Sequence, residues 1–419
     1  MSVSRGVREP AGSARTSVRS RGAMAALAVC VSAAVLALEC ALGAVGSAGL
    51  PPFLTPLKVS PKPGFTEFAL GKANGRPSAI TLGPDGSLWF VETRHNNIGR
   101  ITPSGKISEF AIPSPGAEPR GIAAGPDGNV WFTEGRGNKI GRTTTAGKIS
   151  EFPIPTTNSV PFAITAGPDG NLWFTDPAAN TVGRITPGGT ISEFPIPTAL
   201  SSPFGIAAGP DGNLWFTEQH TQKIGRITPG GTISEFPVAS PPYGITAGPD
   251  GNLWFTGWVS GKIGRITPSG VVTEFPIPER SGPRGITAGP DGNVWFGEWS
   301  GNAIGRITPT GKLSQFPIPT EEGFPSAITA GPHGTIWFLE EMAGKVARIE
   351  PRLLTAKCAV PKLRGKTLAQ ARKLLRRANC TLGKVTARAK RKHKLVVVAQ
   401  KPAAKKTRPY GAKVNLRLG

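Results

Sequence analysis

Two sets of side chains recur along this 419-residue chain in a pattern that could support chemistry. Acids follow a Trp-Phe pair at intervals of 39 to 42 residues, with one glycine in the series: Glu92, Glu134, Asp176, Glu218, Gly257, Glu298 and Glu340. A second set follows a proline at the start of an apolar segment: Ser78, Arg120, Phe162, Phe204, Tyr243, Arg284 and Ser326. Carboxylates gathered at a channel mouth could hold a cation or act as a general base. The alternative is that they accept hydrogen bonds from the backbone or from arginines as parts of the repeat.

Two further tryptophans indicate a second candidate site. Trp258 and Trp299 come just after the repeated motif, and they are the only tryptophans outside the regular series. With Tyr243, Arg284 and Glu298 they are expected to form an aromatic, partly charged patch that binds a ligand. Stacking faces with a few polar groups suit a sugar ring or an aromatic peptide. The alternative is that the extra tryptophans only cover the protein surface.

The repeat itself predicts the elements that must position these side chains. Its regular tryptophans are Trp89, Trp131, Trp173, Trp215, Trp254, Trp295 and Trp337. Four apolar segments alternate with turn signals in each unit, for example at 205–208, 214–217, 223–227 and 232–236. The turns contain Gly-Pro-Asp-Gly or Thr-Pro-Gly-Gly, whose prolines and glycines supply the φ values of tight turns. This pattern predicts an all-β, seven-bladed propeller with four strands in each blade, in which both candidate sets share one face.

The ends of the repeat array indicate how the ring closes. A Glu-Phe strand appears at 65–68, ahead of the first Trp-Phe pair, and no Glu-Phe strand follows the last unit at Arg348. The N-terminal strand is therefore expected to complete the seventh blade as its outermost strand, which leaves no incomplete blade. We assign residues 65–351 to the propeller.

Residues 1–48 have the features of an export signal. Arginines precede an apolar stretch of 15 residues from Met24 to Leu38, and small residues follow it. This stretch is too short to span a membrane and matches the apolar region of a signal segment. Export is therefore expected, and the alternative is that the segment remains as an anchor. Residues 49–64 are rich in proline and are read as a linker.

Residues 352–419 form a strongly basic domain. They contain 21 Lys and Arg and no Asp or Glu, which accounts for nearly all of the net charge of +23. Apolar residues at helical spacing predict a helix at 367–378, and the segments 395–399 and 413–418 read as strands. A helix packed on a small sheet makes an α+β domain of a size that is marginal without a staple.

Four cysteines bear on that stability. Cys30 and Cys40 lie in or beside the signal segment, whereas Cys358 and Cys380 bracket the predicted helix. In an exported protein, two cysteines that flank a small domain favour a disulfide. The alternative is two buried free thiols.

Two parts of the chain resemble known families. The repeat Gly-Pro-Asp-Gly-Asn-Leu-Trp-Phe-Thr-Glu, with Lys-Ile-Gly-Arg-Ile-Thr-Pro and Glu-Phe-Pro-Ile-Pro, resembles the virginiamycin B lyase (streptogramin lyase) family. That resemblance implies a seven-bladed propeller and a magnesium-assisted elimination that opens the ester of type B streptogramins. The segment Val-Pro-Lys-Leu-Arg-Gly-Lys-Thr-Leu-Ala and a later Gln-Lys-Pro resemble a PASTA domain, a module of bacterial cell-wall-associated proteins.

The lyase resemblance implies four functional positions, and three of them hold other residue types here. The family has histidines where this chain has Arg284 and Ser326, and a glutamate where it has Phe324. Only the acid near the last Trp-Phe pair has a counterpart, at Glu340 or Glu341, which are therefore the candidate catalytic residues. An elimination needs a base and an acid, and a guanidinium group stays protonated. The resemblance therefore implies the fold more firmly than the lyase activity. A bound Mg²⁺ is implied only by this resemblance.

Three functions from different classes remain open. The first is an exported envelope protein whose propeller binds a small-molecule or glycan ligand and whose residues 352–419 bind peptidoglycan or an anionic wall polymer. The second is a virginiamycin B lyase-type carbon–oxygen lyase that uses Glu340, Glu341 or the histidine loops at His95 and His220. The third is a nucleic-acid binder, but Tyr410 is the only stacking aromatic of the basic domain, so contact would be unspecific. We favour the first, as a secreted or envelope-associated monomer without a specific nucleic-acid partner.

Overall fold

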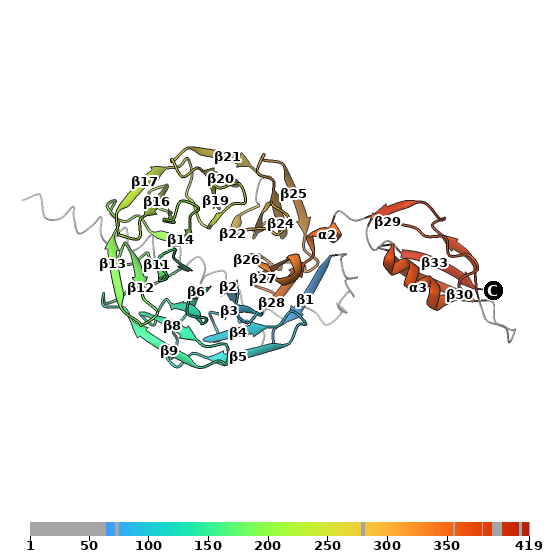
Figure 1. Ribbon diagram of the computed structural model, residues 1–419, viewed down its shortest axis with the longest axis horizontal. Coiled ribbons are helices and arrows are strands. Elements are labelled where there is room, and N and C mark those ends of the chain that lie inside the picture. The colour runs from blue at the N-terminus through green and yellow to red at the C-terminus, as the bar shows by residue number, and fades with distance from the viewer. Residues whose placement is uncertain are drawn as a thin grey trace, which may run out of the picture. The chain divides into compact units, whose positions relative to one another are not determined.

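The computed structural model describes residues 64–71, 75–277, 281–354, 357–378, 380–387, 396–409 and 413–418. The predicted export signal and, apart from Gly64, the predicted linker lie outside these residues. The described chain forms a seven-bladed β-propeller and a small α+β domain at the C-terminal end (Figure 1), which confirms the predicted fold class. Over the described segments, no helix is long and apolar enough to cross a membrane.

The first three blades are four-stranded antiparallel sheets whose strands follow chain order from the inside outward. Blade 1 contains β2 (Pro77–Leu82), β3 (Leu88–Glu92), β4 (Asn97–Ile101) and β5 (Ile107–Ala111). Blade 2 contains β6 (Pro119–Ala124), β7 (Val130–Glu134), β8 (Lys139–Thr143) and β9 (Ile149–Pro153). Blade 3 contains β10 (Ile164–Ala166), β11 (Leu172–Asp176), β12 (Thr181–Ile185) and β13 (Ile191–Pro195).

The next three blades repeat this order. Blade 4 contains β14 (Pro203–Ala208), β15 (Leu214–Glu218), β16 (Lys223–Ile227) and β17 (Ile233–Pro237). Blade 5 contains β18 (Ile245–Ala247), β19 (Leu253–Gly257), β20 (Lys262–Ile266) and β21 (Val272–Pro276). Blade 6 contains β22 (Pro283–Ala288), β23 (Val294–Glu298), β24 (Ala303–Ile307) and β25 (Leu313–Pro317).

The seventh blade joins the two ends of the propeller. It contains β26 (Pro325–Gly331), β27 (Thr335–Glu340), β28 (Lys345–Ile349) and, outermost, β1 (Phe65–Ala69), with the 3₁₀ turn η1 (Pro332–Gly334) between β26 and β27. The β1 strand pairs antiparallel with β28 in the register Phe65↔Ile349 to Ala69↔Lys345. The predicted ring closure is therefore present, and β1 lies beside β28 in Figure 1.

The motif residues explain why each unit forms a blade, as blade 4 shows. Trp215 is fully buried, its ring stacks on Phe236 with 5.4 Å between centroids, and its Nε1 donates to Asp211 at 3.0 Å. The Arg226 guanidinium lies 5.6 Å from the centre of the Trp215 ring. It also donates to the carbonyl of Pro268 in blade 5 at 3.1 Å. The repeated arginine thus covers the aromatic stack and ties neighbouring blades together.

Two glycines of the motif are required by geometry. Gly212 closes the Gly-Pro-Asp-Gly turn with φ +74°, a conformation that favours glycine. A Cβ added to Gly225 of Ile-Gly-Arg would lie 2.1 Å from the Phe216 ring. The buried Phe ring therefore occupies the space that a side chain would need at that position.

The C-terminal domain packs one helix against a small sheet. Its elements, after the single-turn helix α2 (Pro351–Leu354), are β29 (Lys357–Ala359), α3 (Leu368–Arg377), β30 (Thr381–Ala387), β31 (Val397–Lys401), β32 (Thr407–Pro409) and β33 (Lys413–Leu418). The central strand β33 pairs parallel with β30 and antiparallel with β31, and β29 pairs with β32. Leu354 of α2 packs against the core of blade 7, so the contacts of the propeller reach this residue.

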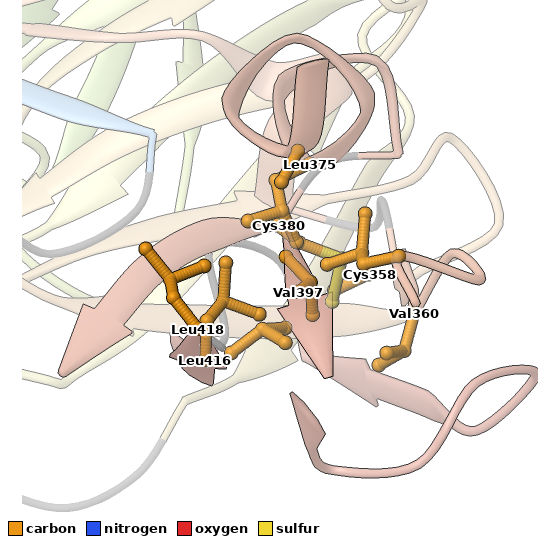
Figure 2. Packing of buried hydrophobic residues seen from close by; sticks show 10 residues of the cluster. Cys358, Val360, Leu375, Cys380, Val397, Leu416 and Leu418 are labelled. Atoms are coloured by element: carbon orange, nitrogen blue, oxygen red, sulfur yellow. A yellow bond between two sulfur atoms is a disulfide. The ribbon is translucent and has the colours of Figure 1, made fainter. Parts of the chain in front are cut away.

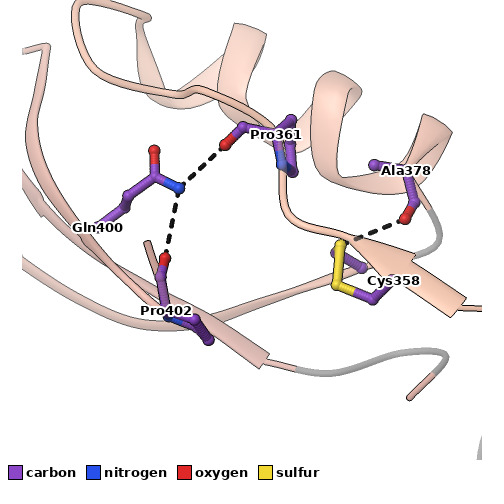
Figure 3. Close-up of a disulfide and its surroundings, with 6 residues drawn as sticks. Cys358, Pro361, Ala378, Gln400 and Pro402 are labelled. Atoms are coloured by element: carbon purple, nitrogen blue, oxygen red, sulfur yellow. Dashed lines mark hydrogen bonds between the residues drawn. A yellow bond between two sulfur atoms is a disulfide. The ribbon is translucent and has the colours of Figure 1, made fainter. Parts of the chain in front are cut away.

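The core of this domain contains the predicted pair of cysteines. Cys358 and Cys380 form a disulfide in the structure, with 4.8 Å between their Cα atoms. They are packed with buried side chains of the helix and the sheet (Figure 2): Val360, Leu363, Ala371, Leu375, Val397, Val414, Leu416 and Leu418. Beside them, Gln400 Nε2 donates to the carbonyl of Pro361 at 2.9 Å (Figure 3), which holds the segment that leads from β29 toward α3.

Candidate functional site

The inner strands begin with a recurring strained residue on the predicted functional face. In five blades the residue before the first proline of the inner strand has a left-handed backbone with φ between 47° and 55°: Arg76, Glu118, Ser202, Gly282 and Phe324. Four of these are not glycine, and such residues store backbone strain that clusters at functional sites. The strained residues therefore indicate that this face of the ring is a candidate functional surface.

The motif acids do not line that face. Glu92, Glu134, Asp176, Glu218, Glu298 and Glu340 are at most 1% exposed and end the second strand of their blades. Asp176 accepts hydrogen bonds from the backbone of Val160, Ala178 and Ala179. The structure therefore places these acids inside the blades and not around a channel mouth, and Asp176 has the backbone hydrogen bonds that the alternative interpretation expects.

Burial raises the pKa of several of these carboxyl groups. The pKa of Glu134 rises to about 8, first because the group is buried and next because Glu151 is nearby. Burial also raises the pKa of Glu218 and of Glu340 to about 7. The folded protein therefore holds protons on these groups at pH values where an unfolded chain would release them.

These shifts predict that the propeller loses stability as the pH rises from about 5 to about 8. A raised folded-state pKa means that the folded state binds more protons in this range, so the free energy of unfolding falls with increasing pH. Each kcal/mol of lost stability lowers Tm by about 2–4 °C in domains of this general size. We expect calorimetry to show a falling Tm between pH 6 and pH 8.5, and a shallower fall for Glu134→Gln. Glu322→Gln, in an exposed loop, is the control. An equal slope of Tm against pH for Glu134→Gln and the unmodified protein would contradict the prediction.

The residues one place after the motif acids do reach the face and meet there. In blades 5, 6 and 7 these residues are Trp258, Trp299 and Glu341. Glu341 binds Arg76 of blade 1 (Nη2 to Oε1, 2.8 Å) and Arg284 of blade 6 (Nη1 to Oε2, 3.4 Å). The indole Nε1 of Trp299 donates to the same carboxylate at 3.3 Å. We call Arg76, Arg284, Trp299 and Glu341 the arginine–glutamate network.

Aromatic rings continue from this network around the inner circle. Phe162 and Phe204 have ring centroids 4.4 Å apart, Phe204 and Tyr243 5.4 Å, and Tyr243 and Trp258 6.2 Å. We call these four residues the aromatic arc. The Arg284 guanidinium lies 5.0 Å from the ring centre of Trp258 and 4.3 Å from that of Trp299, and so connects the arc to the network.

Four of the five predicted ligand-binding residues therefore lie together, and the fifth does not. The rings of Tyr243, Trp258 and Trp299 all surround the Arg284 guanidinium, at 6.0, 5.0 and 4.3 Å from their centres. Glu298 is instead buried in blade 6 and accepts a hydrogen bond from Gln315 at 2.6 Å. Glu298 was expected on the face as one of the motif acids, but it ends β23 and its side chain is buried inside the blade. Glu341 supplies the acid of the patch instead.

Two neighbouring positions were missed by sequence reasoning. Arg76 has no motif that marks it, because its partner Glu341 is 265 residues away and meets it only through ring closure. Phe324 was noted only as the residue that replaces a glutamate, yet its ring contacts Trp299 at 4.6 Å. The one available signal was its position two residues before Ser326, which is where Arg76 also stands relative to Ser78.

The two candidate catalytic acids are adjacent in sequence and separated in environment. Glu340 is fully buried and pairs in register with Lys345, whereas Glu341 belongs to the network. Both carboxylate oxygens of Glu341 have cationic or N–H partners, so this group is an anchor for arginines and poorly placed to take a proton from a substrate. The His95 loop adjoins the network, because the backbone N–H of Arg94 donates to the carbonyl of Gly75, next to Arg76, at 3.2 Å. His95 Nδ1 itself lies 3.8 Å from the buried Glu92, and His220 is exposed in blade 4.

The face does not suit the magnesium ion that the lyase resemblance implies. Two guanidinium groups flank Glu341, and they repel a dication. Within the segments that the structure describes, no cluster of three His, Cys, Asp or Glu side chains could hold a metal ion.

Comparison with known proteins agrees with this architecture. A model of the virginiamycin B lyase family matches residues 57–241 and 238–373, which is more than half of the chain. The chain belongs to the virginiamycin B lyase family. A PASTA domain model matches residues 359–419. Comparison with curated proteins gives no match.

Solved structures of this family are similar over the whole propeller. Virginiamycin B lyase from Staphylococcus aureus is 40% identical, with a TM-score of 0.67, over 69% of this chain and 99% of its own. A catalytically inactive histidine-to-alanine variant of that lyase, solved with quinupristin, is 41% identical, with a TM-score of 0.66, over 69% of this chain and 99% of its own. Kuenenia stuttgartiensis hydrazine synthase, at 16% identity and a TM-score of 0.57 over 67% of this chain and 97% of its own, shares the fold alone.

Proposed function

We propose that this member of the family is an exported ligand-binding protein that has kept the propeller without the elimination chemistry. One observation carries the proposal: Arg284 is held between two tryptophans and bonded to Glu341, at a position where the lyase resemblance implies a histidine. A permanently protonated group in that place can bind and orient a ligand but cannot accept its proton. The surrounding aromatic arc offers stacking faces for a sugar ring or an aromatic group.

Exposed apolar residues on the face support a small-molecule or glycan ligand. Leu200, Val259 and Met342 are large apolar residues that remain exposed, and they lie in the loops of this same face. Apolar surface that stays exposed beside a few polar groups is typical of a binding site. A ligand would stack on the arc and offer acceptor atoms to Arg284, while the apolar loops cover its rim.

Tryptophan fluorescence tests this site directly. We expect purified muropeptides or virginiamycin B to quench the emission of the full chain, and Trp299→Ala to weaken binding at least about tenfold, as truncation of a central aromatic contact commonly does. Arg120→Ala is the control, because Arg120 stands in blade 2 where Arg284 stands in blade 6 and lies outside the arginine–glutamate network. A probe that binds both variants equally well would place its site away from the arginine–glutamate network.

A lyase activity is the second candidate. It is favoured by the relatives, which are described as virginiamycin B lyases at 40 to 41% identity, one of them solved with quinupristin. In this case Glu340 or Glu341 would have to supply the base. The buried position of Glu340 and the two arginines on Glu341 weigh against it.

The basic C-terminal domain supports attachment to the cell wall. It matches a PASTA domain, and PASTA domains bind peptidoglycan-related ligands, which suggests an extracytoplasmic or envelope setting. Its sequence has 21 cations and no acid between residues 352 and 419, so peptidoglycan or an anionic wall polymer is a fitting partner. We propose that the protein acts there as a secreted or wall-held monomer.

Sedimentation with purified cell walls measures this attachment. We expect the full chain to bind walls at low salt and to be released as salt rises, because the screening length shortens from ~8 Å at 0.15 M to ~3 Å at 1 M. A chain that ends after Leu354 keeps α2 and the propeller and should stay in solution. Binding that is equal at both salt concentrations would show that the basic domain does not make the contact through its charges.

A further inference from the structure

The sheet of the C-terminal domain has a second face that the helix does not cover. Along β33, Val414, Leu416 and Leu418 are buried in the core, and the residues between them are exposed. An open groove of about 200 Å³ lies on this sheet. Its lining includes side chains from all three strands: Lys384, Thr386, Ala399, Lys401, Asn415 and Arg417.

Two irregularities in the sheet shape this groove. The pairing of β30 with β33 shifts register between Leu382 and Val385, and Asn415 Oδ1 accepts a hydrogen bond from the backbone N–H of Lys384 at 2.7 Å. On the other side of β33, the pairing with β31 shifts between Val397 and Ala399. Bulges of this kind redirect side chains and often lie beside binding sites. Each outer strand therefore bends next to the groove.

The register gathers three cations in a small area. Lys401 pairs with Asn415, and Lys384 bonds to the same asparagine from the opposite strand, so the two lysines flank Asn415 at about two strand spacings, or ~10 Å. Arg417 lies two residues further along β33, and its register partners are the small residues Thr386 and Ala399. Small neighbours leave the guanidinium group accessible. No acid in residues 352–419 neutralises these charges.

We propose that this groove binds a phosphodiester polymer of the polyol phosphate type, which deepens the proposed wall attachment and rests on it. Lysines act as point charges for phosphate, and the planar guanidinium of arginine can bind a phosphate through two parallel hydrogen bonds. One cation from each strand suits an anion whose charges repeat along a flexible chain. The groove is lined by no aromatic side chain among the described residues, so it offers no stacking surface for nucleobases or sugar rings.

Titration calorimetry of the full chain with a synthetic glycerol-phosphate oligomer tests the assignment. We expect the triple variant Lys384→Gln, Lys401→Gln, Arg417→Gln to lose at least about tenfold in affinity, with a weaker salt dependence, because three phosphate contacts disappear. The matched control is Lys366→Gln, Arg372→Gln, Lys373→Gln, which removes the same charge from exposed positions on and before the helix. It should change affinity less than about twofold. Melting curves confirm that both variants are folded.

The outcomes separate this inference from the wall attachment itself. Equal losses in the two triple variants would overturn the groove and show diffuse charge attraction. A single-stranded DNA oligonucleotide of equal charge that binds as tightly as the oligomer would overturn the polyol phosphate assignment. Walls that sediment the full chain while the oligomer fails to bind would refute the groove alone, and walls that do not bind at all would refute the wall attachment.

Discussion

Deletion of residues 65–70 is expected to abolish cooperative unfolding of the propeller, whereas deletion of residues 1–60 should leave it intact. The β1 strand supplies the outer edge of blade 7, and its loss would expose the whole length of β28. Phe68 stacks on Trp337 with 5.6 Å between centroids, and Phe65 packs edge-on against Phe338 at 6.3 Å. Loss of these aromatic contacts removes core packing that typically contributes several kcal/mol per residue.

Calorimetry of the two truncated chains gives the measurement. The loss should be larger than for a simple core truncation, because Glu67 also binds Lys345 at 3.1 Å and accepts a hydrogen bond from Thr320 at 3.0 Å. Phe68→Ala serves as a milder variant that lowers Tm without removing the strand. Two truncated chains that melt at the same temperature would show that the ring does not depend on this closure.

The fold was predictable because the sequence repeats with a short period. A unit that repeats at 39 to 42 residues with fixed turn signals leaves few architectures, and the position of the first Glu-Phe strand fixes the closure. The repeated contacts are also local: Asp211 and Trp215, for example, are four residues apart. The prediction for the C-terminal domain was less exact. The structure adds three strands that were not predicted: β30, and the short strands β29 and β32, which have no strong apolar pattern.

The site was predictable only where the repeat is broken. Trp258 and Trp299 depart from the regular tryptophan series, and the structure indeed places them together with Tyr243 and Arg284. Glu298 was misplaced because all the motif acids were read as face residues, whereas they end the second strands of their blades with buried side chains. Arg76 was missed because its contact with Glu341 exists only after the ring has closed, and no local pattern records such a contact.

The unmodified protein is expected to linearise virginiamycin B more slowly than its lyase relatives by at least ~10²–10⁴, because that is the usual cost of losing one positioned proton-transfer group and three of the family's positions differ here. The triple variant Arg284→His, Phe324→Glu, Ser326→His should then gain activity. The new histidine at position 284 would release Glu341 from one of its two arginines. A glutamate at position 324 is compatible with the backbone there, because Glu118 has the same left-handed conformation at the equivalent position of blade 2 (φ 48° against 52°).

Mass spectrometry of the linear product, with magnesium present, measures this gain. The double variant Ser78→His, Arg120→His is the matched control. Ser78 and Arg120 stand in blades 1 and 2 where Ser326 and Arg284 stand in blades 7 and 6, and they lie outside the arginine–glutamate network. We expect turnover in the triple variant and none above background in the control. Turnover by the unmodified protein at the rate of its relatives, lost on Glu340→Gln with Glu341→Gln, would contradict the proposal. It would mean that the buried Glu340 or the arginine-bound Glu341 acts as the catalytic base, although the surroundings of both carboxylates disfavour this role.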